Sequence, residues 1–173
     1  MRESGDFEIS KKMLTTALTI CKWHPDELAE EMADSLFSLA SLMNSHNQPK
    51  AALSYAEQHF KQRMKVEMGH SPMRKVAVTA HSELALSYML NNRITEGLEL
   101  SREAQLLLER TQEFRNGKYW PTFLLIHQAL MLMELGNIAD AEELLLKTIE
   151  WREKRYGPND TESFKSVARS NRL

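Results

Sequence analysis

The stretch Leu125-Ile126-His127-Gln128-Ala129 decides the fold, because its pattern occurs three times in the chain. The other two copies are Leu36-Phe37-Ser38-Leu39-Ala40 and His81-Ser82-Glu83-Leu84-Ala85. In each copy the final alanine belongs to a segment whose apolar residues recur with helical periodicity. The three alanines lie 45 and 44 residues apart, and a period of about 44 residues predicts an array of stacked repeats.

A turn signal and a small residue follow each of these alanines at fixed distances. Seven residues later comes a residue that tolerates a left-handed backbone, and these residues are Asn47, Asn92 and Gly136. Five residues later again comes a small residue, and these are Ala52, Gly97 and Ala141. One repeat is therefore predicted to be a helix, a tight turn and a second helix that approaches the first closely at the small residue.

The chain breaks at Gly- and Pro-containing segments, which divide one helical-repeat domain, residues 1–173, into units. The first helix is predicted over residues 7–22 and the next from Pro25 onward. The predicted units are a half-repeat at 5–24, repeat one at 25–69, repeat two at 70–117, repeat three at 118–157, and a partial first helix at 158–173.

Both predicted ends are half-repeats without a polar capping helix. We expect a piece of a longer array, a truncated product, or a chain that associates with itself through its uncapped ends. The apolar residues expected to lack neighbours there are Leu14 and Leu18 at one end, and Phe164 and Val167 at the other.

The composition indicates which classes of partner and which cellular compartment to expect. The net charge is −2, with 22 basic and 24 acidic residues that are interspersed, so no nucleic acid and no membrane partner is predicted. Residues 1–13 lack the apolar run of a secretory signal, and the single cysteine, Cys21, is predicted to pack inside. A cytoplasmic location is therefore expected.

The third copy resembles the tetratricopeptide repeat, in the long-period form of kinesin light chains. The resemblance rests on Ala129, Gly136 and Ala141, and on the loop Tyr156-Gly157-Pro158-Asn159-Asp160. It implies an all-α fold, a right-handed α-solenoid of tetratricopeptide-like helix pairs, and a non-enzymatic scaffold that binds a protein or peptide.

The repeats are also similar to those found C-terminal to nucleotide-binding switch ATPases of the fungal and bacterial immune-receptor kind. The alternative function is therefore a regulatory or sensor segment of a larger nucleotide-binding switch protein, which docks within its own chain. The two functions differ in whether an ATPase domain precedes the repeats in the reading frame.

No residue pattern indicates catalysis, a cofactor or a metal site. No two of the six histidines have the spacing of a zinc-binding helix, and phosphate-binding glycine loops are absent. We predict that the chain is not an enzyme and binds no cofactor and no metal; an enzyme built on an α-solenoid is the weakest alternative. His81 and His127 are interpreted as hydrogen-bonded histidines between helices.

Charged clusters are interpreted as solvated faces. Glu27, Glu30 and Glu31 are expected to point outward near a helix start, where they favour the helix dipole. The one modest basic cluster is expected to be an exposed helix end and loop, and it comprises Lys61, Arg63, Lys65, Arg74 and Lys75.

In this fold the first helix of each pair lines the concave surface. Counting along that face from the repeated alanines predicts a partner-binding groove that becomes more apolar along the array. Its residues are Phe37, Ser82, Leu86, Met89, Phe123, Ile126, Leu130 and Met133. The alternative is that neighbouring repeats or a second copy of the chain cover these side chains.

Overall fold

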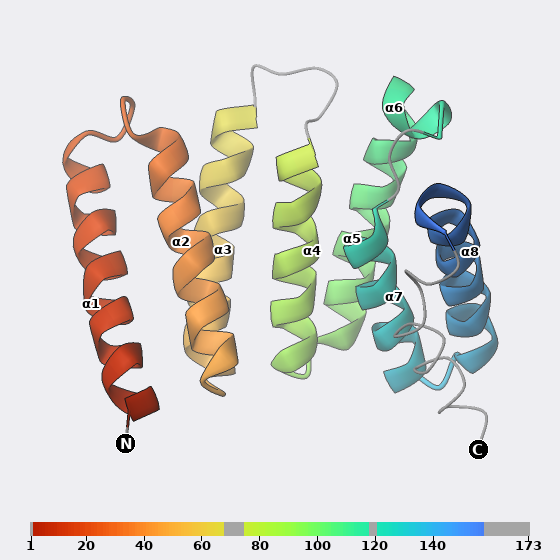
Figure 1. Cartoon of the computed structure of the whole chain (residues 1–173), viewed down its shortest axis with the longest axis horizontal. Helices are drawn as coiled ribbons and strands as arrows, with labels where there is room; N and C mark the ends of the chain where they lie inside the picture. Colours follow the sequence, from red (N-terminus) through yellow and green to blue (C-terminus); the bar gives the residue numbers. More distant parts are fainter. Residues whose placement is uncertain (1, 68–74, 118–120, 158–173) are drawn as a thin grey trace.

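The computed structural model describes residues 2–67, 75–117 and 121–157, and Figure 1 shows them as a row of antiparallel helices. The regular elements in these ranges are all helical. They are α1 (Arg2–Trp23), α2 (Ala29–Ser45), α3 (Pro49–Glu67), α4 (Lys75–Leu90), α5 (Ile94–Glu109), α6 (Gln112–Arg115), α7 (Thr122–Glu134) and α8 (Ile138–Tyr156).

Helices that follow each other along the chain pack as pairs. The pairs are α2 with α3, α4 with α5, and α7 with α8, while α1 packs against α2. We call α2, α4 and α7 the first helices and α3, α5 and α8 the second helices. The pairs are joined by contacts of α3 with α4, of α5 with α7, and of α4 with α7. This arrangement is a helical solenoid.

The three predicted turns have the same backbone geometry. Asn47, Asn92 and Gly136 have φ angles of 55°, 61° and 78°, in the left-handed region. In each turn the next residue donates its N–H to a carbonyl near the helix end, which closes the helix in the Schellman manner. These bonds are Gln48 N to Met43 O at 2.9 Å, Arg93 N to Tyr88 O at 2.9 Å, and Asn137 N to Leu132 O at 2.8 Å. The turn prediction is confirmed at all three positions.

The repeated small residues lie where helices approach closely. Ala40, Ala85 and Ala129 are buried, as are Ala52 and Ala141 in the second helices. The closest approach is at Gly97 of α5, where an added Cβ would lie 2.7 Å from the Ala85 carbonyl oxygen and 2.8 Å from Met131 Sδ. Only glycine fits at this position, so the α4–α5 pair packs more tightly than an alanine would allow.

Replacing Gly97 with alanine is therefore expected to lower the free energy of unfolding by about 1 to 3 kcal/mol, because the backbone of α4 must shift to admit the methyl group. Urea denaturation of the variant measures the loss. Gly136→Asn is the matched control, since no atom lies within 4 Å of the Cβ it would add and asparagine already makes the other two turns. Equal stability of Gly97→Ala and the parent chain would contradict this packing.

Two helix starts differ from the prediction, and one short helix is additional. Helix α1 begins at Arg2 and not at residue 7, and α2 begins at Ala29 and not at Pro25. The chain reverses between these helices through turns, in which Leu28 N donates to His24 O at 2.9 Å, so Pro25 starts a turn. The short helix α6 was not predicted, and the Thr111 hydroxyl accepts the Phe114 N–H at its start.

The exposed apolar residues at the α1 end are not those predicted. Leu18 is buried against Leu36 and Leu39, and Leu14 is partly buried beside them. The outer side of α1 exposes different side chains, and these are Ile9, Met13, Ile20 and Trp23. Self-association through this end remains a prediction, and Phe164 and Val167 lie outside the described residues.

Candidate functional site

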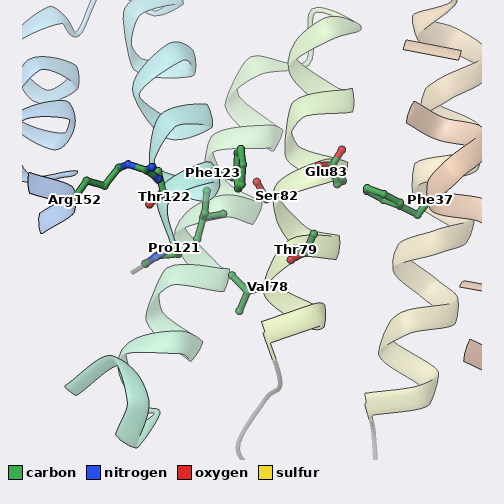
Figure 2. Close-up of a pocket in the computed structure, with 10 residues that line it drawn as sticks. Phe37, Val78, Thr79, Ser82, Glu83, Pro121, Thr122, Phe123 and Arg152 are labelled. Atoms are coloured by element: carbon green, nitrogen blue, oxygen red, sulfur yellow. The ribbon is translucent and has the colours of Figure 1, made fainter. Parts of the chain in front are cut away.

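A hollow of about 500 Å³ lies against the first helices, and Figure 2 shows the side chains around it. Helix α2 contributes one residue, α4 four, the start of α7 three, the preceding Pro121 one, and α8 one. They are Phe37, Val78, Thr79, Ser82, Glu83, Pro121, Thr122, Phe123, Leu124 and Arg152. The hollow opens because α2 and α4 have no close backbone contact with each other, although α3 packs against both.

Two phenylalanines flank this hollow. Phe37 projects from α2 toward α4 and is half-buried, with its ring 5.6 Å from that of His59. Phe123 lies on the first turn of α7 and is 76% exposed. A phenyl ring in solvent contributes nothing to the core, and its burial by a partner would be favourable. The pair therefore offers two aromatic anchors on one surface.

Ser82, which lines the hollow, forms a hydrogen bond between two repeats. Ser82 Oγ of α4 lies 2.8 Å from His127 Nδ1 of α7, and Ser82 is buried. Burial lowers the pKa of His127, so the ring is neutral at pH 7. His127 is therefore a hydrogen-bonded histidine between helices, as predicted, and the Ser82 hydroxyl already has its partner.

His81 is also satisfied, but through its own helix. Its Nδ1 lies 2.7 Å from the Ala77 carbonyl oxygen, and its ring meets Phe60 edge-on with 4.7 Å between the centroids. Burial lowers the pKa of His81. Its side chain packs inside the array and does not line the hollow.

Glu83 brings a carboxylate to the wall of the hollow. Its side chain is partly buried, and none of the residues that the structure describes forms a hydrogen bond or ion pair with it. Burial raises the pKa of this carboxyl group because the charged form is poorly solvated there. The hollow thus holds one negative charge that has no counterion in the described part of the chain.

At neutral pH this unpaired charge opposes folding. The raised pKa means that the folded state prefers the protonated acid, so stability is lost as the pH rises through that pKa. Glu83→Gln is therefore expected to raise the melting temperature at pH 7 and to leave it nearly unchanged in acid. Thermal unfolding followed by circular dichroism at both pH values measures this. A lower melting temperature at pH 7 would mean that Glu83 has a stabilising partner.

The opposite side of the hollow carries a cation. Arg152 reaches it from α8, and its guanidinium lies 5.5 Å from the centre of the Tyr156 ring. In Figure 2 Arg152 and Phe37 appear at opposite sides of the site. The two ends of the hollow therefore differ in charge.

The structure brings only some of the predicted groove residues into this hollow. Phe37, Ser82 and Phe123 line it. Met89, Ile126 and Met133 are partly buried against the core cluster that contains Ala85 and Ala129. Leu86 and Leu130 are partly buried in the second halves of α4 and α7. The hollow lies against the first halves of these two helices, where α2 stands apart.

Glu83 and Arg152 line the hollow although the repeat pattern did not predict them. Glu83 follows the predicted Ser82, but adjacent residues of a helix point about 100° apart, so counting along one helical face did not include it. Arg152 belongs to a second helix, and no sequence signal places a second helix at the concave surface. Only the packing of α8 beside the start of α7 brings it there.

The predicted basic cluster is not a free cationic surface. Arg63 is buried, and its guanidinium pairs with Glu30 and, at 2.7 Å, with Asp34 of α2. The interpretation of Arg63 as an exposed cation, and of Glu30 as a purely solvated acid, is therefore wrong. The helices α2 and α3 pack with these residues facing each other. The Lys65 side chain is exposed, and its Nζ lies 3.7 Å from Asp26 Oδ1. Arg74 and the side chain of Lys75 lie outside the part of the chain that the structure describes.

Within the described ranges, no three His, Cys, Asp or Glu side chains are grouped as a metal site would require. Among the same residues, every helix is too short or too polar to cross a bilayer. Cys21 is buried, as predicted from its helical face.

Comparison with known proteins gives the fold class. No protein-family model matches the chain, and no curated protein matches it. Two crystal structures of nearly identical TPR-like repeats, from a Podosopora anserina protein named as a kinesin light chain, superpose on it with TM-scores of 0.73 and 0.71. The identities are 17% and 16%, over 96% of this chain and 78% and 79% of those chains.

The chain therefore has the fold of a tetratricopeptide-like repeat protein. The all-α helical solenoid predicted from the three repeated alanines is confirmed. At these identities the likeness concerns the fold alone.

Proposed function

We propose that the chain is a non-enzymatic protein-interaction module that binds a short segment of a partner protein over the hollow between α2, α4 and α7. The observation that carries this proposal is the pair Phe37 and Phe123. Both rings border one apolar-walled hollow, and Phe123 is mostly exposed. Aromatic anchors around one pocket are typical of the residues that supply most of the energy at a protein interface.

The fold supports the same proposal, because stacked helix pairs form extended surfaces that suit the binding of peptides and helices. The predicted residues Leu86, Met89, Ile126, Leu130 and Met133 continue the surface along α4 and α7. They are partly buried, so we assign them a supporting role beside the two phenylalanines. The proposed module is cytoplasmic.

The test is selection of short random peptides displayed on phage, with the chain immobilised. The best peptides are synthesised with a fluorophore and their affinities are measured by anisotropy. Phe37→Ala combined with Phe123→Ala is expected to weaken binding more than tenfold, because two anchors of one pocket are lost. Much of the affinity should persist at high salt, since the two rings contribute buried apolar area, which salt does not screen.

Two control variants separate this site from other surfaces. Leu106→Ala removes an exposed apolar residue of similar size on α5 and is expected to leave the affinity unchanged. Lys61→Glu combined with Lys65→Glu reverses two exposed positive charges of α3. If the lysine variant abolishes binding while the phenylalanine variant does not, the partner docks on α3 and the proposed site is wrong.

A further inference from the structure

We infer that the partner segment inserts one basic side chain, arginine or lysine, between Phe37 and Phe123 and onto the carboxylate of Glu83. This inference rests on the proposed function, because it names the chemistry of the segment that binds in the same hollow. It predicts a specific preference among partners, where the two phenylalanines alone would accept many apolar segments.

In the free protein, Glu83 carries a carboxylate that is unpaired within the described part of the chain. Its carboxylate borders the hollow, is partly desolvated, and has no hydrogen-bond or ion-pair partner among the described residues. A bound segment that covers the hollow removes more water from this group. Unless the segment supplies a donor, the buried charge is left unpaired, which is strongly unfavourable. A neutral apolar segment is therefore a poor match for this surface.

Two aromatic rings border the hollow together with this carboxylate. In Figure 2 Glu83 lies between Phe37 and Phe123, and all three border one hollow. The face of a phenyl ring attracts a cation, and a guanidinium can stack on a ring while it donates hydrogen bonds to a carboxylate. Two rings beside one unpaired carboxylate fit a side chain with an apolar stem and a cationic end.

The Glu83 carboxylate lies at one end of the hollow, which α2 and α4 form. Arg152 borders the hollow from α8, with its guanidinium near the Tyr156 ring. The basic side chain is therefore placed on the Glu83 carboxylate, at the end of the hollow formed by α2 and α4. An acidic side chain at the Glu83 end would be repelled by the carboxylate. The charge pattern thus also orients the segment along the array.

The experiment runs the peptide selection in parallel on the parent chain and on Glu83→Gln. We expect arginine and lysine to be enriched in peptides selected on the parent chain and not in peptides selected on Glu83→Gln. The selection on the variant serves as the control for compositional bias of the peptide library. Glu83→Gln keeps the size of the side chain and one acceptor oxygen, and it removes the negative charge.

A synthetic pair of peptides then measures the contribution of the charge. The best basic peptide is compared with the same peptide carrying citrulline, the neutral isostere, in place of its arginine, or norleucine in place of its lysine. We expect the neutral peptide to bind the parent chain at least tenfold more weakly than the basic peptide, because it cannot form the charge-assisted hydrogen bond with Glu83. Both peptides should bind Glu83→Gln about equally, because this bond is absent there with either peptide. Glu99→Gln, at an exposed carboxylate of α5, should keep the parent's discrimination.

The outcomes distinguish this inference from the function on which it rests. The inference is wrong if the selected peptides depend on Phe37 and Phe123 but are not enriched in arginine or lysine. It is also wrong if this enrichment is the same on Glu83→Gln as on the parent chain. In both cases the proposed interaction module stands. If no selected peptide depends on the two phenylalanines, the proposed function is wrong and the inference falls with it.

Discussion

Replacing both carboxylates that face Arg63, as Glu30→Ala with Asp34→Ala, is expected to lower the free energy of unfolding by about 3 to 5 kcal/mol. Arg63 of α3 is buried, and its two terminal nitrogens pair with these acids of α2, while Nε has no partner among the described residues. Removing both acids leaves a buried guanidinium with no counterion. Urea denaturation at neutral pH measures the loss.

Two further variants show that the cost comes from the unpaired charge. Glu31→Ala removes an exposed acid from the same first turn of α2 and reports the contribution of the helix dipole. Adding Arg63→Met to the double alanine variant is expected to recover most of the lost stability, because a neutral side chain of similar length then fills the site. If the triple variant is no more stable than the double variant, the pairing of Arg63 is not what matters there.

Lowering the pH from 7 to about 4 is expected to cost about 2 to 3 kcal/mol of stability through His59 alone. Burial, and then the charge of Arg63, lower the pKa of His59 from 6.5 to about 4, while Asp34 opposes this shift. The unfolded chain therefore binds the proton more tightly than the folded one. The stability that this group contributes is complete above pH 6.5 and is lost as the pH falls toward 4.

Other buried groups add to this dependence or oppose it. Burial lowers the pKa values of His81 and His127, so both destabilise the fold as acid protonates them. Glu83 acts in the opposite direction, because burial raises the pKa of its carboxyl group. The difference between the parent chain and His59→Gln isolates the contribution of His59.

The measurement is urea denaturation of both chains at neutral pH and near pH 4. His59→Gln should lose clearly less stability than the parent on acidification. His24→Gln, on the exposed turn between α1 and α2, is the control and should follow the parent. An identical pH dependence of His59→Gln and the parent would show that His59 does not couple folding to protonation.

The sequence by itself determined the repeat and its turns. The alanines at 40, 85 and 129 are buried, and the left-handed residues at 47, 92 and 136 end the first helices, as their spacing predicted. These features are local, because a left-handed φ or a close helix contact restricts the residue type at that very position. Because these features recur, the fold class could be predicted from the sequence. Superposition on solved repeat structures confirms this fold class.

Only the tertiary structure decided where a partner segment can bind. The hollow forms because α2 stands apart from α4, and no local pattern reports the spacing between helices of different repeats. It joins Phe37, Glu83 and Arg152 from three helices, and the periodicity of one helix cannot show which face stays uncovered. The same holds for Arg63, which the sequence places among exposed lysines and the packing of α2 on α3 buries in an ion pair. Burial and pairing depend on residues distant along the chain, so they follow from the assembled array and not from its repeat.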